Sequence, residues 1–146
     1  FMRSNLITGT FVTAFIARLD APSGRMHYVS CGHNPPYIFR KADGKISEEL
    51  LQQSGTAFGL RYDMEYRVHR LDLKPGETVL IYSDGITEAM NPKNEEYGEE
   101  RLMELAEQLD NAGATEARDA VLSDVKEFLG SNQPQDDQTL VVVKVV

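Results

Sequence analysis

Short runs of β-branched and aromatic residues, each ended by a turn sequence, constrain the fold of this chain more than any other feature. One run covers residues 10–19, and the turn cluster at 20–24 leads into residues 25–30, the predicted hairpin partner. After a loop that ends in Pro35-Pro36, residues 37–40 resume the extended pattern up to an Asp43-Gly44 turn. This order predicts a meander of short antiparallel strands.

Two later runs extend the pattern. Residues 65–73 alternate apolar and polar side chains, and Lys74-Pro75-Gly76 then leads into the apolar run 78–82, which predicts a second hairpin. The last run, 140–146, is too apolar for a solvent-facing edge strand, so we expect it at the centre of a sheet.

Between these runs the apolar residues follow the period of amphipathic helices. One helix is predicted through residues 102–109 and another through 117–128, which Thr115 would cap. The chain has 146 residues, of which 41% are hydrophobic and 26% charged, as expected of one soluble domain. We therefore predict a single α+β domain over residues 1–146, in which helices pack on the outer faces of strands.

The charge and cysteine content exclude several classes of function. Fifteen Lys and Arg against 23 Asp and Glu give a net charge of −8, which disfavours nucleic acid and anionic membranes as partners. Cys31 is the single cysteine, and no Cys/His group has zinc-site spacing, which fits a cytoplasmic protein. No apolar run approaches the ~20 residues that cross a bilayer, so we expect no membrane insertion of this domain.

The first candidate site is Asp84-Gly85, which directly follows the apolar run 78–82. A strand end holds a carboxylate rigidly, and the glycine lets backbone or water approach closely, which suits a hard cation. A plain strand-ending turn explains the same residues.

The second candidate is Asp136-Asp137, immediately before the last apolar run. Adjacent carboxylates repel each other unless water or a cation offsets their charge, so both a solvated loop and a metal site fit. Two strand-associated Asp motifs in a chain without a Cys or His metal set favour the metal site.

The third candidate is His33, which could act as a general acid or base because imidazole titrates near neutral pH. A structural role beside a Gly and an Asn-Pro turn is the competing interpretation. No G-x-S-x-G elbow accompanies Ser83, so a Ser-His-Asp triad is not supported, and no phosphate-binding glycine loop is present.

Taken in order, a set of short motifs resembles the bacterial PP2C-like serine/threonine phosphatases of the SpoIIE/RsbU family. The motifs are Cys31-Gly32-His33-Asn34-Pro35-Pro36, Phe58-Gly59-Leu60, Leu73-Lys74-Pro75-Gly76-Glu77, Tyr82-Ser83-Asp84-Gly85-Ile86-Thr87-Glu88-Ala89, Tyr97-Gly98-Glu99-Glu100-Arg101-Leu102 and Asp136-Asp137-Gln138-Thr139-Leu140. The resemblance spans almost the whole chain. It implies an α-β-β-α sandwich of two antiparallel sheets flanked by helices.

The same resemblance implies hydrolysis of phosphoserine or phosphothreonine by water held between two Mn²⁺ or Mg²⁺ ions, with no protein nucleophile. It assigns Asp84 and Asp136 as ligands of one metal. We place Gly85, His33, Asn34, Asp137 and Thr139 beside the site. His33 occupies the place of an aspartate that the eukaryotic branch links to a weaker third metal, so that third site is in doubt here.

The family's Gly-Asp-x-x-Asp motif, whose aspartate bridges both metals, has no counterpart in this chain, because no Asp precedes Asp20. We expect this motif upstream of Phe1, so that residues 1–146 are the larger, C-terminal part of the domain. This fragment is then expected to be inactive while the parent protein is active.

The resemblance also suggests a phosphorylated regulatory protein as substrate, such as an anti-sigma factor antagonist. A sensor or receiver domain upstream in the same chain and a homodimer are further expectations. Two other classes of function stay open: a non-catalytic PP2C-like module that binds a protein, and an unrelated acidic Ca²⁺-binding domain.

Overall fold

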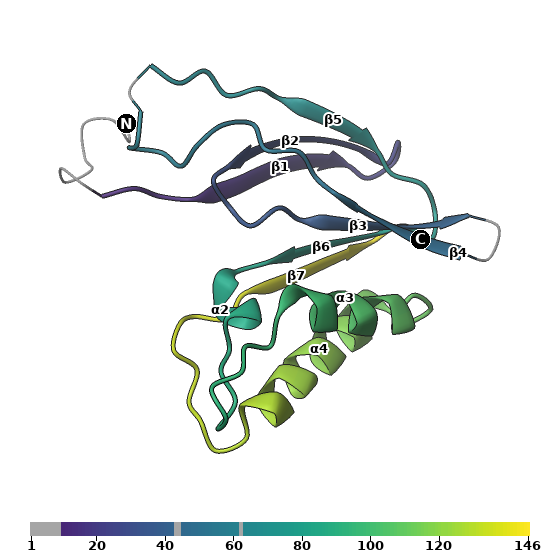
Figure 1. Ribbon diagram of the computed structural model, residues 1–146. Helices are drawn as coiled ribbons and strands as arrows, with labels where there is room; N and C mark the ends of the chain where they lie inside the picture. The colour runs from purple at the N-terminus through teal and green to yellow at the C-terminus, as the bar shows by residue number, and fades with distance from the viewer. Residues whose placement is uncertain (1–9, 43–44, 62) are drawn as a thin grey trace. The chain divides into compact units, whose positions relative to one another are not determined.

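The computed structural model describes residues 10–42, 45–61 and 63–146 (Figure 1). The chain divides into two separately packed units. The first unit comprises the chain up to Pro35 together with Leu50–Lys74, and the second comprises Pro36–Glu49 and Pro75–Val146. No helix in the described part of the chain is both long and apolar enough to span a bilayer.

The first unit contains a three-stranded sheet of β1 (Ala14–Asp20), β2 (Arg25–Cys31) and β5 (His69–Asp72), in the order β1-β2-β5. Both strand pairs are antiparallel, which confirms the hairpin predicted across residues 20–24. Its turn depends on Gly24, which has φ 67° and would place an added Cβ 2.4 Å from the Leu73 carbonyl oxygen.

The second unit contains a four-stranded sheet in the order β4-β3-β6-β7. Its strands are β3 (Tyr37–Ala42), β4 (Lys45–Leu50), β6 (Thr78–Tyr82) and β7 (Leu140–Lys144). β6 pairs antiparallel with both β3 and β7. The predicted Asp43-Gly44 turn lies outside the described residues.

Three helices complete the second unit: α2 (Asp84–Thr87), α3 (Glu99–Gln108) and α4 (Ala114–Leu129). α3 and α4 lie together on one face of the sheet (Figure 1). Their apolar stripes form a core with the strands that includes the fully buried side chains of Leu102 and Val125. Both predicted helices and the expected α+β class, with two antiparallel sheets and few helices, are therefore confirmed.

The predicted cap of α4 is wrong. The residue before the helix is Gly113, whose carbonyl oxygen accepts a hydrogen bond from the Ala117 N–H at 2.9 Å. Thr115 lies within the first turn, because the helix begins at Ala114, one residue before it.

Two predicted strand connections are also wrong. β5 does not form a hairpin with β6, because β5 pairs with β2 whereas β6 pairs with β3 and β7. The intervening turn instead bonds to a distant segment, since the Gly76 N–H donates to the Val145 carbonyl oxygen at 2.9 Å. The meander also breaks between β2 and β3, which belong to different sheets.

β7 is not central as predicted: within the described part of the chain it lies at one end of its sheet, beside β6. Its apolar sequence has another cause. Leu140 and Val142 pack against the helical core, while Val141 points the other way and is 45% exposed. The helices therefore explain the apolar character that suggested a second strand neighbour.

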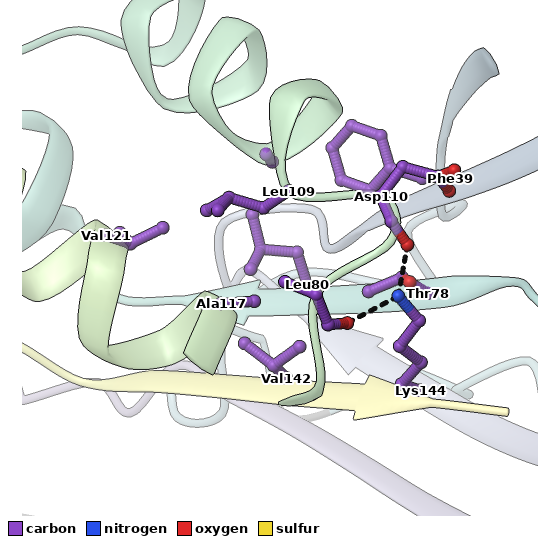
Figure 2. Close-up of a pocket in the computed structure, with 11 residues that line it drawn as sticks. Phe39, Thr78, Leu80, Leu109, Asp110, Ala117, Val121, Val142 and Lys144 are labelled. Carbon is purple, nitrogen blue, oxygen red and sulfur yellow. Dashed lines mark hydrogen bonds between the residues drawn. The ribbon is translucent and has the colours of Figure 1, made fainter. Parts of the chain in front are cut away.

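Lys144, the last residue of β7, joins that strand to the loop between α3 and α4 (Figure 2). Its ammonium group donates to the backbone carbonyl oxygens of Asp110 and Ala112. These carbonyls follow the end of α3, where a cation also complements the helix dipole. Around this contact, Phe39, Leu80, Leu109, Val121 and Val142 line an apolar pocket.

Replacing Lys144 with methionine tests this contact. Lys144→Met keeps most of the side-chain stem but removes the charged donor, so we expect the free energy of unfolding to fall by about 1–3 kcal/mol. Lys93→Met, at an exposed turn residue, is the matched control and should change stability by less than about 0.5 kcal/mol. Urea denaturation measures both, and equal effects of the two substitutions would contradict the assigned role of Lys144.

Candidate metal centre

The two predicted acidic motifs meet because β6 and β7 are paired. The ladder ends with Tyr82 opposite Leu140, and one further backbone bond follows, from the Ser83 N–H to the Thr139 carbonyl oxygen at 3.0 Å. Antiparallel pairing puts the end of one strand beside the start of the other. Asp84 and the segment 136–139 consequently lie at the same end of the β6–β7 ladder.

Gly85 determines how closely these two segments approach. A Cβ atom built on Gly85 would lie 2.5 Å from the Asp137 carbonyl oxygen and 3.3 Å from the Asp136 carbonyl carbon. The first turn of α2 therefore packs directly on the backbone carbonyl groups of Asp136 and Asp137. Glycine is required here because a larger side chain would not fit against this backbone. This is the close approach that the sequence predicts.

Two side chains that the sequence analysis did not select also join the segments. The Ser83 hydroxyl donates to the Asp137 carbonyl oxygen at 2.9 Å and accepts from the Thr139 N–H at 2.9 Å. The Gln138 side-chain amide donates to the Gly85 carbonyl oxygen at 3.1 Å. Sequence reasoning examined Ser83 only as a nucleophile and passed over Gln138.

The carboxylates of Asp84 and Asp136 are both exposed, and each uses one oxygen in a local hydrogen bond. Asp84 Oδ1 accepts the Gly85 N–H at 3.0 Å, and Asp136 Oδ1 accepts the Asp137 N–H at 2.7 Å. In the described part of the chain neither carboxylate has a cationic side chain as partner. Exposed carboxylate oxygens without a cationic partner are the donors that Mg²⁺ and Mn²⁺ prefer.

A small acidic hollow borders the same segments. Its lining residues include Gly85, Glu88, Glu96, Gln135 and Asp136. Among the described residues, however, no group of three or more His, Cys, Asp or Glu side chains is arranged to hold a metal ion. These residues thus fit a divalent cation as a part of its ligand set.

Tyr82 fixes the end of β6 that carries the first motif. Its side chain is buried, and its hydroxyl donates to Glu99 Oε1 at 2.8 Å. Burial, together with the hydrogen bond and charge of Glu99, holds the pKa of Tyr82 well above its ordinary value. The phenol therefore stays protonated and keeps its donor at physiological pH.

The predicted residues divide between the two units. Asp84, Gly85, Asp136, Asp137 and Thr139 are together in the second unit, as described above. His33 and Asn34 belong to the first unit. Their assignment beside the metal stays a prediction.

The loop that carries His33 is held by Gln53. The Gln53 amide donates to the His33 carbonyl oxygen at 2.6 Å and accepts from the Gly32 N–H at 3.2 Å. It also accepts from the buried Ser30 hydroxyl at 3.2 Å. Gly32 has φ 64°, a conformation that favours glycine. The backbone at His33 is thus fixed by a residue that sequence analysis did not select.

Comparison with solved structures defines the class of this fold. The SiaA-PP2C domain of Pseudomonas aeruginosa matches with a TM-score of 0.80 and 21% identity, over 98% of this chain and 56% of that one. The phosphatase domain of SpoIIE from Bacillus subtilis matches with a TM-score of 0.64 and 21% identity, over 97% of this chain and 60% of that one. The chain therefore has a PP2C-like fold, which confirms the predicted fold class.

The sequence comparison is more specific. The model of the family described as Stage II sporulation protein E (SpoIIE) matches residues 1–146, and the chain belongs to this family. Phosphoserine phosphatase RsbU of Bacillus subtilis is 25% identical over 145 residues, covering 98% of this chain and 42% of RsbU. Protein IcfG of Synechocystis is 29% identical over 133 residues, covering 91% of this chain and 20% of IcfG. The chain thus spans less than half the length of either relative.

Substitution of Gly85 tests whether its segment packs closely against Asp137. Gly85→Ala would raise helix propensity, but the added methyl group must displace the Asp137 peptide, so we expect a net loss of about 1–3 kcal/mol in unfolding free energy. Ser123→Ala, at an exposed position within α4, is the control for introducing alanine into a helix of the same unit. Thermal unfolding of both variants measures the difference. An unchanged melting temperature for Gly85→Ala would show that the segments are not in close contact.

Proposed function

We propose that this chain forms part of a metal-dependent protein serine/threonine phosphatase domain, with Asp84 and Asp136 as ligands of one Mn²⁺ or Mg²⁺ ion. The observation that carries the proposal is that two segments meet where β6 ends and β7 begins, each with an exposed carboxylate that has no cationic partner among the described residues. Membership of the SpoIIE family supports it.

When bound, divalent cations lower the pKa of a coordinated water and neutralise charge on the phosphoryl oxygens. The chain's own residues hold and orient the ligands: the β6–β7 ladder sets the two segments, and Gly85 allows their close approach. The hydroxyl of Ser83 is not the nucleophile in this proposal. Its single proton is donated to the Asp137 carbonyl oxygen rather than to a basic side chain of the described residues.

We further propose that residues 1–146 are the C-terminal larger part of one phosphatase domain and that further carboxylates complete a dinuclear site. Support comes from the ligand count, since the described residues contain no group of three or more metal-binding side chains. A hard cation needs about six oxygen ligands, which two carboxylates and water supply only weakly.

The proposed substrate is a phosphorylated regulatory protein, such as an anti-sigma factor antagonist, in a cytoplasmic signalling pathway. The relative RsbU is named a phosphoserine phosphatase, which supports this class of substrate. The net charge of −8 agrees with a protein partner and disfavours nucleic acid. An upstream sensor or receiver domain and a homodimer belong to the same proposal, as do His33 and Asn34 beside the metal.

Substitution of the two aspartates tests the metal assignment. In the full-length protein, Asp84→Asn and Asp136→Asn should each lower Mn²⁺-dependent hydrolysis of a phosphoserine peptide by roughly 100-fold, because a charged ligand is lost. Asp119→Asn, at an exposed position on α4, is the control and should keep full activity. Activity that survives in both site variants would rule out these residues as ligands.

A second test concerns the completeness of the site. Residues 1–146 alone should show no turnover of p-nitrophenyl phosphate above background at millimolar Mn²⁺, whereas the full-length protein should be active. Turnover by residues 1–146 at a rate similar to that of the full-length protein would contradict the need for further ligands. Inactivity of both proteins would instead favour the non-catalytic binding module.

A further inference from the structure

The two acidic segments, residues 83–85 and 136–139, are joined by two types of hydrogen bond. Backbone bonds join them up to the end of the β6–β7 ladder, and side-chain bonds join them beyond it. Up to Ser83 the segments are joined by backbone hydrogen bonds, the last of which reaches the Thr139 carbonyl oxygen. Beyond that point, in the described part of the chain, no backbone hydrogen bond joins Asp136, Asp137 or Gln138 to α2. Side chains alone supply the remaining hydrogen bonds.

Ser83 supplies two of these bonds and Gln138 the third. The Ser83 hydroxyl bonds to two backbone groups of the later segment, one on either side of Gln138. The Gln138 amide bonds in the opposite direction, to the Gly85 carbonyl oxygen one residue beyond Asp84. Each residue thus comes from one acidic segment and fixes the backbone of the other.

We infer that Ser83 and Gln138 are positioning residues that set the spacing of the Asp84 and Asp136 carboxylates and thereby the affinity of the site for a divalent cation. The inference rests on the proposed function of these two aspartates. Neither residue would touch the ion. They would act through the backbone of the residues that do.

The positions of the two residues favour this role over a purely structural one. Ser83 and Gln138 are only partly buried, and the segment 135–137 is exposed. Water can therefore replace a lost partner, so that removing the hydroxyl costs the fold little. What is lost is the fixed separation of two like-charged groups, which repel each other when no cation is bound. Loss of such supporting contacts typically weakens metal binding by about 10–100-fold.

The variants distinguish the effect of losing a hydroxyl or amide group from the effect of changing side-chain size. Ser83→Ala removes both hydroxyl bonds, whereas Ser83→Thr keeps a hydroxyl and should restore them. Gln138→Met keeps the length of the side chain and removes the donor. Ser123→Ala and Gln108→Met are matched controls at exposed positions on α4 and α3 of the same unit.

The experiment is a Mn²⁺ titration of the full-length protein by isothermal titration calorimetry, with Asp84→Asn as the variant that lacks a ligand. We expect the dissociation constant to rise by about 10–100-fold in Ser83→Ala and by a smaller factor in Gln138→Met. Ser83→Thr and both controls should stay within about threefold of the unsubstituted protein. Affinity unchanged in Ser83→Ala but lost in Asp84→Asn would overturn the inference and leave the proposed function standing.

Hydrogen exchange without metal provides an independent readout. The Thr139 N–H donates to the Ser83 hydroxyl, so its exchange should quicken in Ser83→Ala and recover in Ser83→Thr. Unchanged exchange would overturn the inference whatever the titration shows. If exchange quickens but Mn²⁺ binding does not depend on Asp84, the proposed function fails, and the claim about metal affinity fails with it.

Discussion

The antiparallel pairing of β6 with β7 is the interaction on which the second unit depends. It places Leu80 and Tyr82 beside Val142 and Leu140 on one face, where α3 and α4 bury them. At its end the same ladder brings together two acidic segments that are far apart in sequence. One set of backbone hydrogen bonds therefore organises both the core and the candidate metal centre, and a change in strand register would move both.

The two roles are separated along the ladder. Side chains on one face of the strands are buried beneath the helices, whereas Asp84 and Asp136 lie beyond the strand ends and are exposed. Exposure spares these charges the desolvation that a buried carboxylate would suffer. The two segments that carry the carboxylates are then held by hydrogen bonds of the Ser83 hydroxyl and the Gln138 amide. The missing side chain of Gly85 lets the segments pack closely.

Much of the fold could be predicted from local patterns, because amphipathic periodicity and a tight turn need only neighbouring residues. Both long helices and the β1–β2 hairpin were found in this way. The connection at Lys74-Pro75-Gly76 was predicted wrongly, since its partner Val145 lies near the other end of the chain. The apolar run of β7 likewise suggested a second strand neighbour, although helices cover it. The sequence alone could identify the motifs at Asp84 and Asp136 as a candidate metal site. It could not predict the contacts of Ser83 and Gln138, because their partners come close only when β6 and β7 pair.

The exposure of Asp84 and Asp136 has a practical consequence for the search for a substrate. Carboxylates that take no part in the core can be exchanged for amides while the surface around them keeps its shape. Under the proposed function, the residues that stabilise the fold of this unit are therefore different from those that bind the metal. If the two aspartates hold the ion as proposed, a protein altered only at these positions would keep the surrounding surface but would no longer dephosphorylate a bound partner. Such a variant could serve as bait to isolate that partner from cell extracts.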